Sequence, residues 1–153
     1  MKRKNLILPL IIVSVLLLGY YSFSRIYKFL TTVETGENIS NVQHLPSWLK
    51  EYLSPHAEQI SYYKQPSFYT AYEYSISEKH FLAWAKEKDI PLKTIDNQPE
   101  EINRYTFFVN SEADRTASIA QGYQYQIIYD NGGGVHIVYD SSDQMAYHSV
   151  TAR

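Results

Sequence analysis

Histidine is the side chain here best suited to proton transfer or metal binding, and it occurs at His44, His56, His80, His136 and His148. Only the last two fall on neighbouring predicted strands, residues 135–139 and 144–150. Because side chains alternate along a strand, they face each other only if the turn is an odd-length loop centred on Ser142; a two-residue turn puts them on opposite faces. Even a facing pair supplies two ligands where zinc takes three or four, and no HxH or HExxH pattern completes the set. The pattern favours exposed strand histidines, with no metal site and no cofactor.

The other reactive groups form no catalytic pattern. Glu100 and Glu101, like Asp140 and Asp143, fall in predicted loops, where paired carboxylates are usually solvated. The glycines at residues 132–134 lie between two predicted strands, which indicates a hairpin tip rather than a phosphate-binding loop. The sequence has no GxSxG motif and no cysteine, which excludes that nucleophile elbow, thiolate chemistry and disulfides. We therefore expect a protein that is not an enzyme.

Tyrosine is the outlier in composition, with 15 of 153 residues. Its apolar ring and polar tip suit both half-buried sheets and binding surfaces. In the predicted strand 68–76, alternation puts Tyr72 and Tyr74 on one face and Tyr69 on the other. If a helix covers the first face, Tyr69 and one of the neighbouring pair Tyr62 and Tyr63 should be displayed to solvent. The predicted binding residues are Tyr62, Tyr63, Tyr69, Tyr123 and Tyr125; the competing interpretation is scattered surface rings without a role.

The elements that position these residues predict an α+β fold, a small antiparallel sheet with one main helix packed on it. Apolar spacing predicts helices over residues 45–53 and 78–88, the second capped by Ser77. Its buried stripe is predicted to be Phe81, Leu82, Trp84 and Ala85. Residues 110–118 fit either a loop or one helical turn. The predicted strands are 60–64, 68–76, 92–95, 105–109, 122–130, 135–139 and 144–150, the last three forming an antiparallel meander.

An uncharged run from residue 5 to residue 24 follows Lys2, Arg3 and Lys4. About 20 helical residues cross a bilayer core, so the run predicts a transmembrane signal-anchor. Three basic residues before the run, against Arg25 and Lys28 after it, favour a cytoplasmic N-terminus. The expected organisation is a cytoplasmic N-terminus (1–4), a transmembrane anchor (5–24), a juxtamembrane tether (25–44) and an extracytoplasmic domain (45–153). The expected anchor residues are Leu6, Ile11, Leu16, Tyr20 and Tyr21.

Two other interpretations of the run stay open. A cleaved secretory signal has the same basic start and apolar stretch, and residues 22–24 resemble a poor version of its cleavage site. A buried helix of a cytosolic protein is the second. A lipid-modified anchor is excluded because the chain has no cysteine to carry the lipid.

Charge narrows the class of partner. The whole chain carries a formal net charge of −2. Lys2, Arg3 and Lys4 account for three of its 14 basic residues, so 11 remain against 16 acidic residues beyond residue 24. A mildly acidic domain has no electrostatic reason to bind nucleic acid or anionic lipid head groups.

Three segments carry a resemblance to known proteins: residues 45–46, residues 76–85 with Phe81, Trp84 and Ala85, and residues 132–140, which contain Gly-Gly-Gly-Val-His. In these the chain resembles small exported or membrane-anchored bacterial domains of unassigned function. The resemblance covers about residues 45–153 and implies an address outside the cytoplasm. It implies no activity, so no functional residue is carried over.

These observations predict a membrane-anchored extracytoplasmic domain that binds an envelope protein partner. A cell-wall glycan-binding module is the first alternative, and it predicts aromatic rings along an exposed groove beside Gln124 and Gln126. A small extracytoplasmic enzyme is the second. It predicts a pocket where a strand histidine meets an acid, the candidates being His136 or His148 with Asp130, Asp140 or Asp143.

Overall fold

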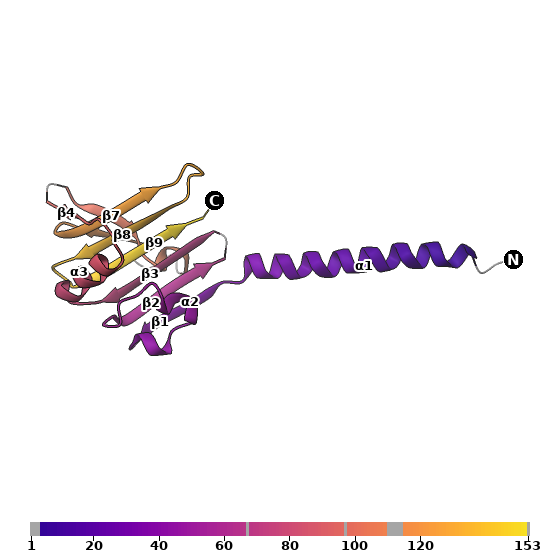
Figure 1. Cartoon of the computed structure of the whole chain (residues 1–153), viewed down its shortest axis with the longest axis horizontal. Coiled ribbons are helices and arrows are strands. Elements are labelled where there is room, and N and C mark those ends of the chain that lie inside the picture. The colour runs from indigo at the N-terminus through magenta and orange to yellow at the C-terminus, as the bar shows by residue number, and fades with distance from the viewer. Residues whose placement is uncertain (1–3, 67, 97, 110–114, 153) are drawn as a thin grey trace. The chain divides into compact units, whose positions relative to one another are not determined.

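The computed structural model describes residues 4–66, 68–96, 98–109 and 115–152, with side chains from Ile11 onward except at residue 108. The chain divides into two compact units, Met1–Thr32 and Val33–Arg153. The first unit consists of helix α1 (Lys4–Thr31), and the second is an α+β domain (Figure 1). The folded domain therefore begins at Val33, twelve residues before the predicted boundary at Leu45.

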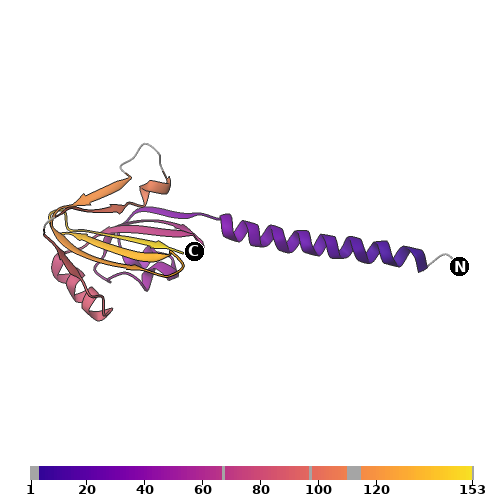
Figure 2. The same ribbon diagram turned by 90° about the horizontal axis from the view of Figure 1, so that it is seen from above.

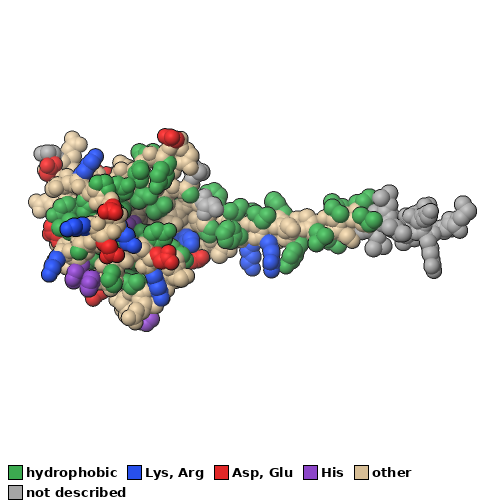
Figure 3. Space-filling view, viewed as in Figure 1, with side chains coloured by type: hydrophobic (Ala, Val, Ile, Leu, Met, Phe, Trp, Pro, Cys, Tyr) green, Lys and Arg blue, Asp and Glu red, His purple; other side chains and the backbone are tan. Residues whose placement is uncertain are grey.

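Helix α1 is continuous over 28 residues and runs past the predicted anchor by seven residues, as far as Thr31. Ile11, Leu16, Tyr20 and Tyr21 are all exposed, while the side chain of Leu6 lies outside the described part. Figure 3 shows hydrophobic side chains along the described part of the helix, with basic side chains on one side. Among the residues described, no helix is both long and apolar enough to cross a membrane.

The domain is built on a seven-stranded sheet with the order β1-β2-β3-β9-β8-β7-β4, and every neighbouring pair is antiparallel. Hairpins β7-β8-β9 form the predicted meander, which is confirmed. Pairing of β3 with β9, from Tyr69 opposite Thr151 to Ser75 opposite Met145, joins this meander to the N-terminal strands. The strands are β1 (Glu34–Ile39), β2 (Glu58–Gln65), β3 (Tyr69–Ser75), β4 (Lys93–Ile95), β7 (Gly122–Ile128), β8 (Gly134–Asp140) and β9 (Met145–Thr151).

Both faces of this sheet are covered, so the domain has three layers (Figure 2). On one side, which we call the helix face, lie η1 (Val42–His44), α2 (Ser47–Lys50) and α3 (Glu78–Glu87). On the other side, the back face, lies a two-stranded sheet of β5 (Glu100–Asn103) and β6 (Thr116–Ile119), together with α4 (Thr106–Val109). The predicted main helix on an antiparallel sheet is confirmed, and the second covering layer is additional.

Helix α3 holds the helix face through aromatic packing. The Phe81 ring stacks on Tyr139 at 4.5 Å between ring centroids, and the Tyr139 hydroxyl donates to the carbonyl oxygen of Ile76 at 3.0 Å. Phe81, Trp84 and Ala85 are buried as predicted, but the prediction for Leu82 is wrong because it is 36% exposed. Leu82 follows Phe81 by about 100° around the helix, which turns its side chain away from the sheet.

Two sequence predictions outside α3 are wrong. Residues 34–39, predicted as tether, form edge strand β1, because backbone pairing with β2 orders a polar segment that has no strong alternation. Residues 105–109, predicted as a strand, contain the helical turn α4, while the nearby strand is β5, at residues predicted mainly as loop. β5 pairs with β6, and the Arg104 N–H donates to the Arg115 carbonyl at 2.9 Å, so pairing ends where α4 begins. Part of the ambiguous segment, residues 110–114, lies outside the described residues.

Candidate functional site

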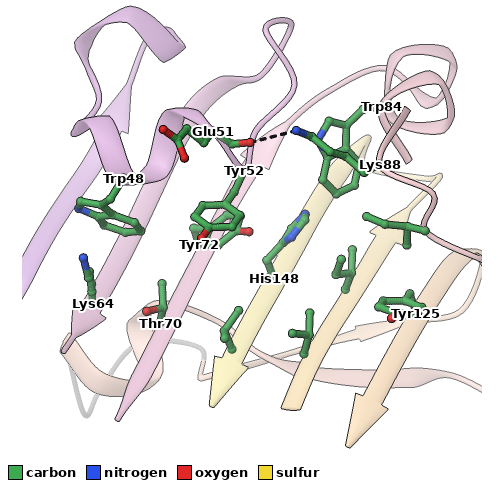
Figure 4. A pocket seen from close by; sticks show the side chains of 14 residues that line it. Trp48, Glu51, Tyr52, Lys64, Thr70, Tyr72, Trp84, Lys88, Tyr125 and His148 are labelled. Atoms are coloured by element: carbon green, nitrogen blue, oxygen red, sulfur yellow. Dashed lines mark hydrogen bonds between the residues drawn. The ribbon is translucent and has the colours of Figure 1, made fainter. Parts of the chain in front are cut away.

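The helices leave part of the helix face open as a groove of about 650 Å³. Its floor is the sheet between α2 and α3, and its walls come from those two helices and the segments that follow them. We call it the aromatic groove, because five of its lining side chains are Trp48, Tyr52, Tyr72, Trp84 and Tyr125. Figure 4 shows Trp48 on one side, Trp84 and Lys88 on the other, and Tyr52, Tyr72 and His148 between them.

Strand register fixes the floor of the groove. One row of directly paired residues crosses four strands, and its members are Tyr72, His148, Ile137 and Tyr125. The next row toward the open end of the sheet contains Thr70, Val150 and Val135. Paired residues in neighbouring strands point to the same face, so both rows face the groove. The floor is therefore mainly apolar and aromatic, with one imidazole at its centre.

His148 is a buried, neutral part of this floor. Its Nε2 atom lies 3.0 Å from the Tyr74 hydroxyl, and its ring stacks on Tyr72 at 4.5 Å between centroids. The indole of Trp84 meets it edge-on at 5.3 Å. Burial lowers the pKa of His148 to about 3, because a charged imidazole loses its hydration there. Burial also raises the pKa of Tyr74 well above its ordinary value, so neither side chain is charged at neutral pH.

The first wall is built around Trp48. Its indole N–H donates to a carboxylate oxygen of Glu34 at 2.9 Å, and its ring packs edge-on against Tyr62 at 5.7 Å. The Lys64 ammonium lies 4.1 Å from the centre of the Trp48 ring, a cation–π contact. Gly36 leaves room for the Tyr62 ring, since a Cβ atom there would lie 2.4 Å from it. Strand β1, which was predicted as tether, thus holds Trp48 and Tyr62 of this wall in place through Glu34 and Gly36.

The second wall is built around Trp84 and Lys88. The Lys88 ammonium donates to the backbone carbonyl of Glu51 at 3.2 Å, which links the end of α3 to the end of α2 across the groove (Figure 4). The Trp84 indole nitrogen is buried, and within the described residues it has no hydrogen-bond partner. A buried donor without a partner carries a free-energy cost.

The predicted binding tyrosines do not form one surface. Tyr125 lines the groove, but Tyr62 and Tyr63 are 7% and 6% exposed, so the prediction that one of them is displayed is wrong. Tyr62 packs against Trp48 of α2 on the helix face, and Tyr63 lies on the back face of β2, the strand that α4 contacts. Tyr69 is half-buried, with its hydroxyl 2.8 Å from the Ser149 hydroxyl. Tyr123 donates its hydroxyl to Glu78 at 2.6 Å.

The histidine pair is split between the two faces. His148 pairs with Ile137, and His136 pairs with Ser149, which is the one-residue offset expected from an even-length turn. His136 faces the back layer, with Nε2 3.2 Å from a Glu100 carboxylate oxygen. Burial lowers the pKa of His136, partly opposed by that carboxylate. No group of three His, Asp or Glu residues in the described ranges has a geometry that could hold a metal ion.

The residues expected beside the rings or the histidines lie elsewhere. Gln124 and Gln126 pair with Val138 and His136, so they lie on the back-face side of β7 and not beside the groove. Asp140 accepts hydrogen bonds from the Ser142 amide at 2.8 Å and its hydroxyl at 2.6 Å. This carboxylate therefore organises the β8–β9 turn instead of meeting a histidine.

Sequence reasoning missed Trp48 and Trp84 as site residues, and it named His148 only in the enzyme alternative. The available signal was that the chain has only two tryptophans, each on a short predicted helix with a neighbouring lysine two or four residues on. No protein-family model matches this chain, and neither a curated protein nor a solved structure matches it.

Proposed function

We propose that this protein is a membrane-anchored binding module of the bacterial envelope, and that its aromatic groove receives an apolar segment of a protein partner. The observation that carries the proposal is the groove itself, with tryptophan and tyrosine rings around an apolar floor. Its volume of about 650 Å³ lies within the range of ligand sites, about 300–1,000 Å³. Tryptophan and tyrosine are also the side chains that dominate protein-recognition hot spots.

The lining chemistry favours a peptide over a glycan. Sugar recognition needs hydrogen-bonding side chains beside the stacking rings, and the two glutamines expected in that role lie on the other face. The floor contributes Val135, Ile137 and Val150, which gain nothing from sugar hydroxyls. Apolar peptide side chains bury their surface against such residues at about 25 cal/mol per Å².

The address is proposed from the N-terminal unit. The uncharged run is headed by Lys2, Arg3 and Lys4, and the described apolar side chains of α1 are exposed along the helix. Apolar side chains on all sides of a helix call for a lipid or protein environment. The N-terminus is then cytoplasmic, and the domain from Val33 onward lies outside the cytoplasm.

A cysteine reporter tests this address, because the chain has no cysteine of its own. Ser142→Cys places a thiol on the exposed β8–β9 turn. We expect a membrane-impermeant maleimide to label it in intact cells or spheroplasts, and the protein to stay with membranes after carbonate extraction. Labelling only after lysis would reverse the orientation, and release by carbonate would refute a spanning anchor.

Site-specific photo-crosslinking tests the groove in cells that make the full chain. A photoreactive residue at Tyr52, exposed and lining the groove, is expected to give a discrete protein adduct. The same group at Tyr129, exposed on the β7–β8 hairpin tip and outside the groove, serves as the control.

A groove-filling variant then decides whether the adduct depends on the groove. Thr70→Trp puts an indole on the floor, whereas Thr94→Trp adds the same bulk on exposed edge strand β4. The adduct should disappear with the first change and persist with the second. An adduct that survives Thr70→Trp, or one that forms equally from Tyr129, would contradict a groove-based function.

A further inference from the structure

We propose that this protein forms a two-fold symmetric dimer in which strand β7 of one copy pairs antiparallel with β7 of a second copy. The pairing uses the half of β7 that β4 leaves uncovered, residues 125–128. The inference goes beyond the proposed function, because it concerns the open edge of the sheet and not the contents of the aromatic groove.

Half of the outer edge of β7 has no neighbouring strand among the described residues. β4 pairs only with the first three residues of β7, 122–124. The Ile90 N–H donates to the carbonyl of Ala85 in α3 at 2.9 Å, so the chain is still in the helix layer there and begins to pair with the sheet at Lys93. Residues 125–128 of β7 therefore lie at a free edge.

The hydrogen-bond pattern shows which backbone groups point outward from this edge. At each end of the β7–β8 ladder an odd-numbered residue bonds across it: the Tyr129 N–H donates to the Gly133 carbonyl at 2.8 Å, and the Gln121 carbonyl accepts at 3.0 Å from the residue after β8. Since bonding alternates along an antiparallel strand, the even-numbered residues turn their N–H and C=O groups away from β8. Beyond the part that β4 covers, these are Gln126 and Ile128, which have no backbone partner on that side within the described part of the chain.

The other edge of the sheet is protected against further pairing, and this one is not. Edge strand β1 contains two glutamates, and its register with β2 shifts between Gly36 and Ile39, where Asn38 has a φ of 51°. Charges and irregularities of this kind keep an edge strand from pairing with another chain. Residues 122–129 contain no charged residue and no proline, and Ile128 is 71% exposed. The uncharged, apolar edge of β7 is thus the one that accepts a further strand.

A two-fold axis at Ile127 pairs the two open residues of each copy with those of the other. Gln126 then lies opposite Ile128 of the second copy, and the copies exchange four N–H···O=C bonds, two at each such pair. No outward backbone group of residues 125–128 is left without a partner. Because the β1 edge is protected, pairing ends at two copies and gives a closed symmetric dimer.

Charge favours a second copy of this chain as the occupant of the edge. In this register Asp130 comes to the level of Gln124 of the second copy, the residue that pairs with Lys93. At each end of the contact an exposed carboxylate therefore comes next to the start of β4, where an exposed lysine stands. The paired strands between these ends are uncharged, so two acidic domains meet without like charges opposite each other.

Cysteine cross-linking tests both the contact and its register, because the chain has no cysteine of its own. Ile127 lies on the axis in a non-hydrogen-bonded pair, with its Cα about 4.5 Å from that of its symmetry mate, which is within reach of a disulfide. Gln126 lies diagonally from its symmetry mate at about 7–8 Å, which is beyond that reach. The variants are Ile127→Cys, Gln126→Cys and, as a control on exposed edge strand β4, Thr94→Cys.

The full chain is oxidised with copper phenanthroline in detergent and resolved by non-reducing electrophoresis. We expect the disulfide-linked dimer of Ile127→Cys to exceed that of either other variant at least fivefold. Adding Gln126→Lys with Ile128→Lys puts like charges opposite each other and should reduce this dimer at least fivefold. Gln126→Glu with Ile128→Lys puts opposite charges there and should retain it. Unchanged tryptophan emission shows that each variant is folded.

The outcomes are distinct from those that test the groove. Equal cross-linking at all three positions, more at Gln126 than at Ile127, or a dimer that the two-lysine variant leaves unchanged overturns this pairing. No cross-link at any position overturns the second copy as occupant and leaves the edge to a strand of another protein. A photoreactive residue at Tyr129 should also link two copies of this chain, and the mass of that adduct separates it from an adduct of Tyr52 with a partner.

Discussion

The buried imidazole of His148 should make the stability of the domain depend on pH. Its folded-state pKa is about 3, against an ordinary value of 6.5. Below pH 6.5 the unfolded chain takes up a proton at this residue, whereas the folded domain does so only near pH 3. Stability is therefore lost as the pH falls through this window, by about 1.4 kcal/mol per pH unit. Between pH 7 and pH 4.5 the loss from His148 alone is about 2 to 3 kcal/mol.

His148→Gln isolates this contribution. Glutamine has no charge at any of these pH values, and its amide can still bond the Tyr74 hydroxyl, the partner of His148 Nε2. Carboxylates that titrate near pH 4.5 contribute equally to both proteins and cancel in the difference. His136, whose pKa is also lowered by burial, cancels in the same way because it lies on the other face of the sheet.

The assay is urea unfolding of the full chain in detergent at a series of pH values, followed by tryptophan emission. Both tryptophans lie in the domain, so the signal does not include α1. The free energy of unfolding of the wild type should fall more steeply below pH 6.5 than that of His148→Gln. Parallel curves for the two proteins would refute the reasoning, as would an NMR titration of the His148 ring with a midpoint near 6.5.

Three further predictions concern packing in the domain outside the groove. The Arg104 Nε–H donates to the buried Glu73 carboxylate at 3.0 Å, so Arg104→Met leaves that carboxylate without its partner. The change should lower the free energy of unfolding in urea by about 2 to 4 kcal/mol. The double variant with Glu73→Leu should be more stable than the single variant. Gly122→Ala should lower the free energy of unfolding by about 3 kcal/mol, because the φ of Gly122 is +150° and a Cβ there would lie 1.8 Å from the Tyr139 carbonyl oxygen. Gly19→Ala is the control, since a Cβ there meets nothing within 4 Å, and it should leave the stability of the domain unchanged. Tyr139→Phe leaves the Ile76 carbonyl without its donor and should lower the free energy of unfolding by about 1 kcal/mol in the same assay. An unchanged free energy would show that this hydrogen bond does not stabilise the domain.

Local pattern was enough for the elements whose neighbours in sequence are also their neighbours in space. The meander of β7, β8 and β9 follows from strict alternation and the glycine-rich turn, and both are properties of adjacent residues. α3 follows from helical spacing and Ser77, although Ser77 bonds His80 Nδ1 at 3.1 Å and gives no side-chain cap to the helix. The end of α1 at Thr31 was not predicted, because the predicted anchor stopped at residue 24 although residues 25–31 contain no helix breaker.

The sequence pattern gave wrong predictions where contacts between segments distant in the sequence determine the local structure. The polar residues of β1 become a strand because they pair with β2. Residues 106–109 form a helical turn directly after the pairing of β5 with β6 ends at Arg104. Tyr63 lies on the back face of β2, the strand that α4 contacts. The spacing of the residues in the sequence does not reveal any of these contacts.

By itself the sequence determined the α+β class, the long apolar helix at the N-terminus and the aromatic richness of the strands. The tertiary structure alone decided which rings share a surface. Trp48, Trp84, Tyr125 and His148 are tens of residues apart, and they meet because the strand order places β3, β9, β8 and β7 side by side. The same order and an even-length turn put His136 on the opposite face from His148. Alternation is a local property of one strand, whereas a binding site is set by which strands and helices become neighbours.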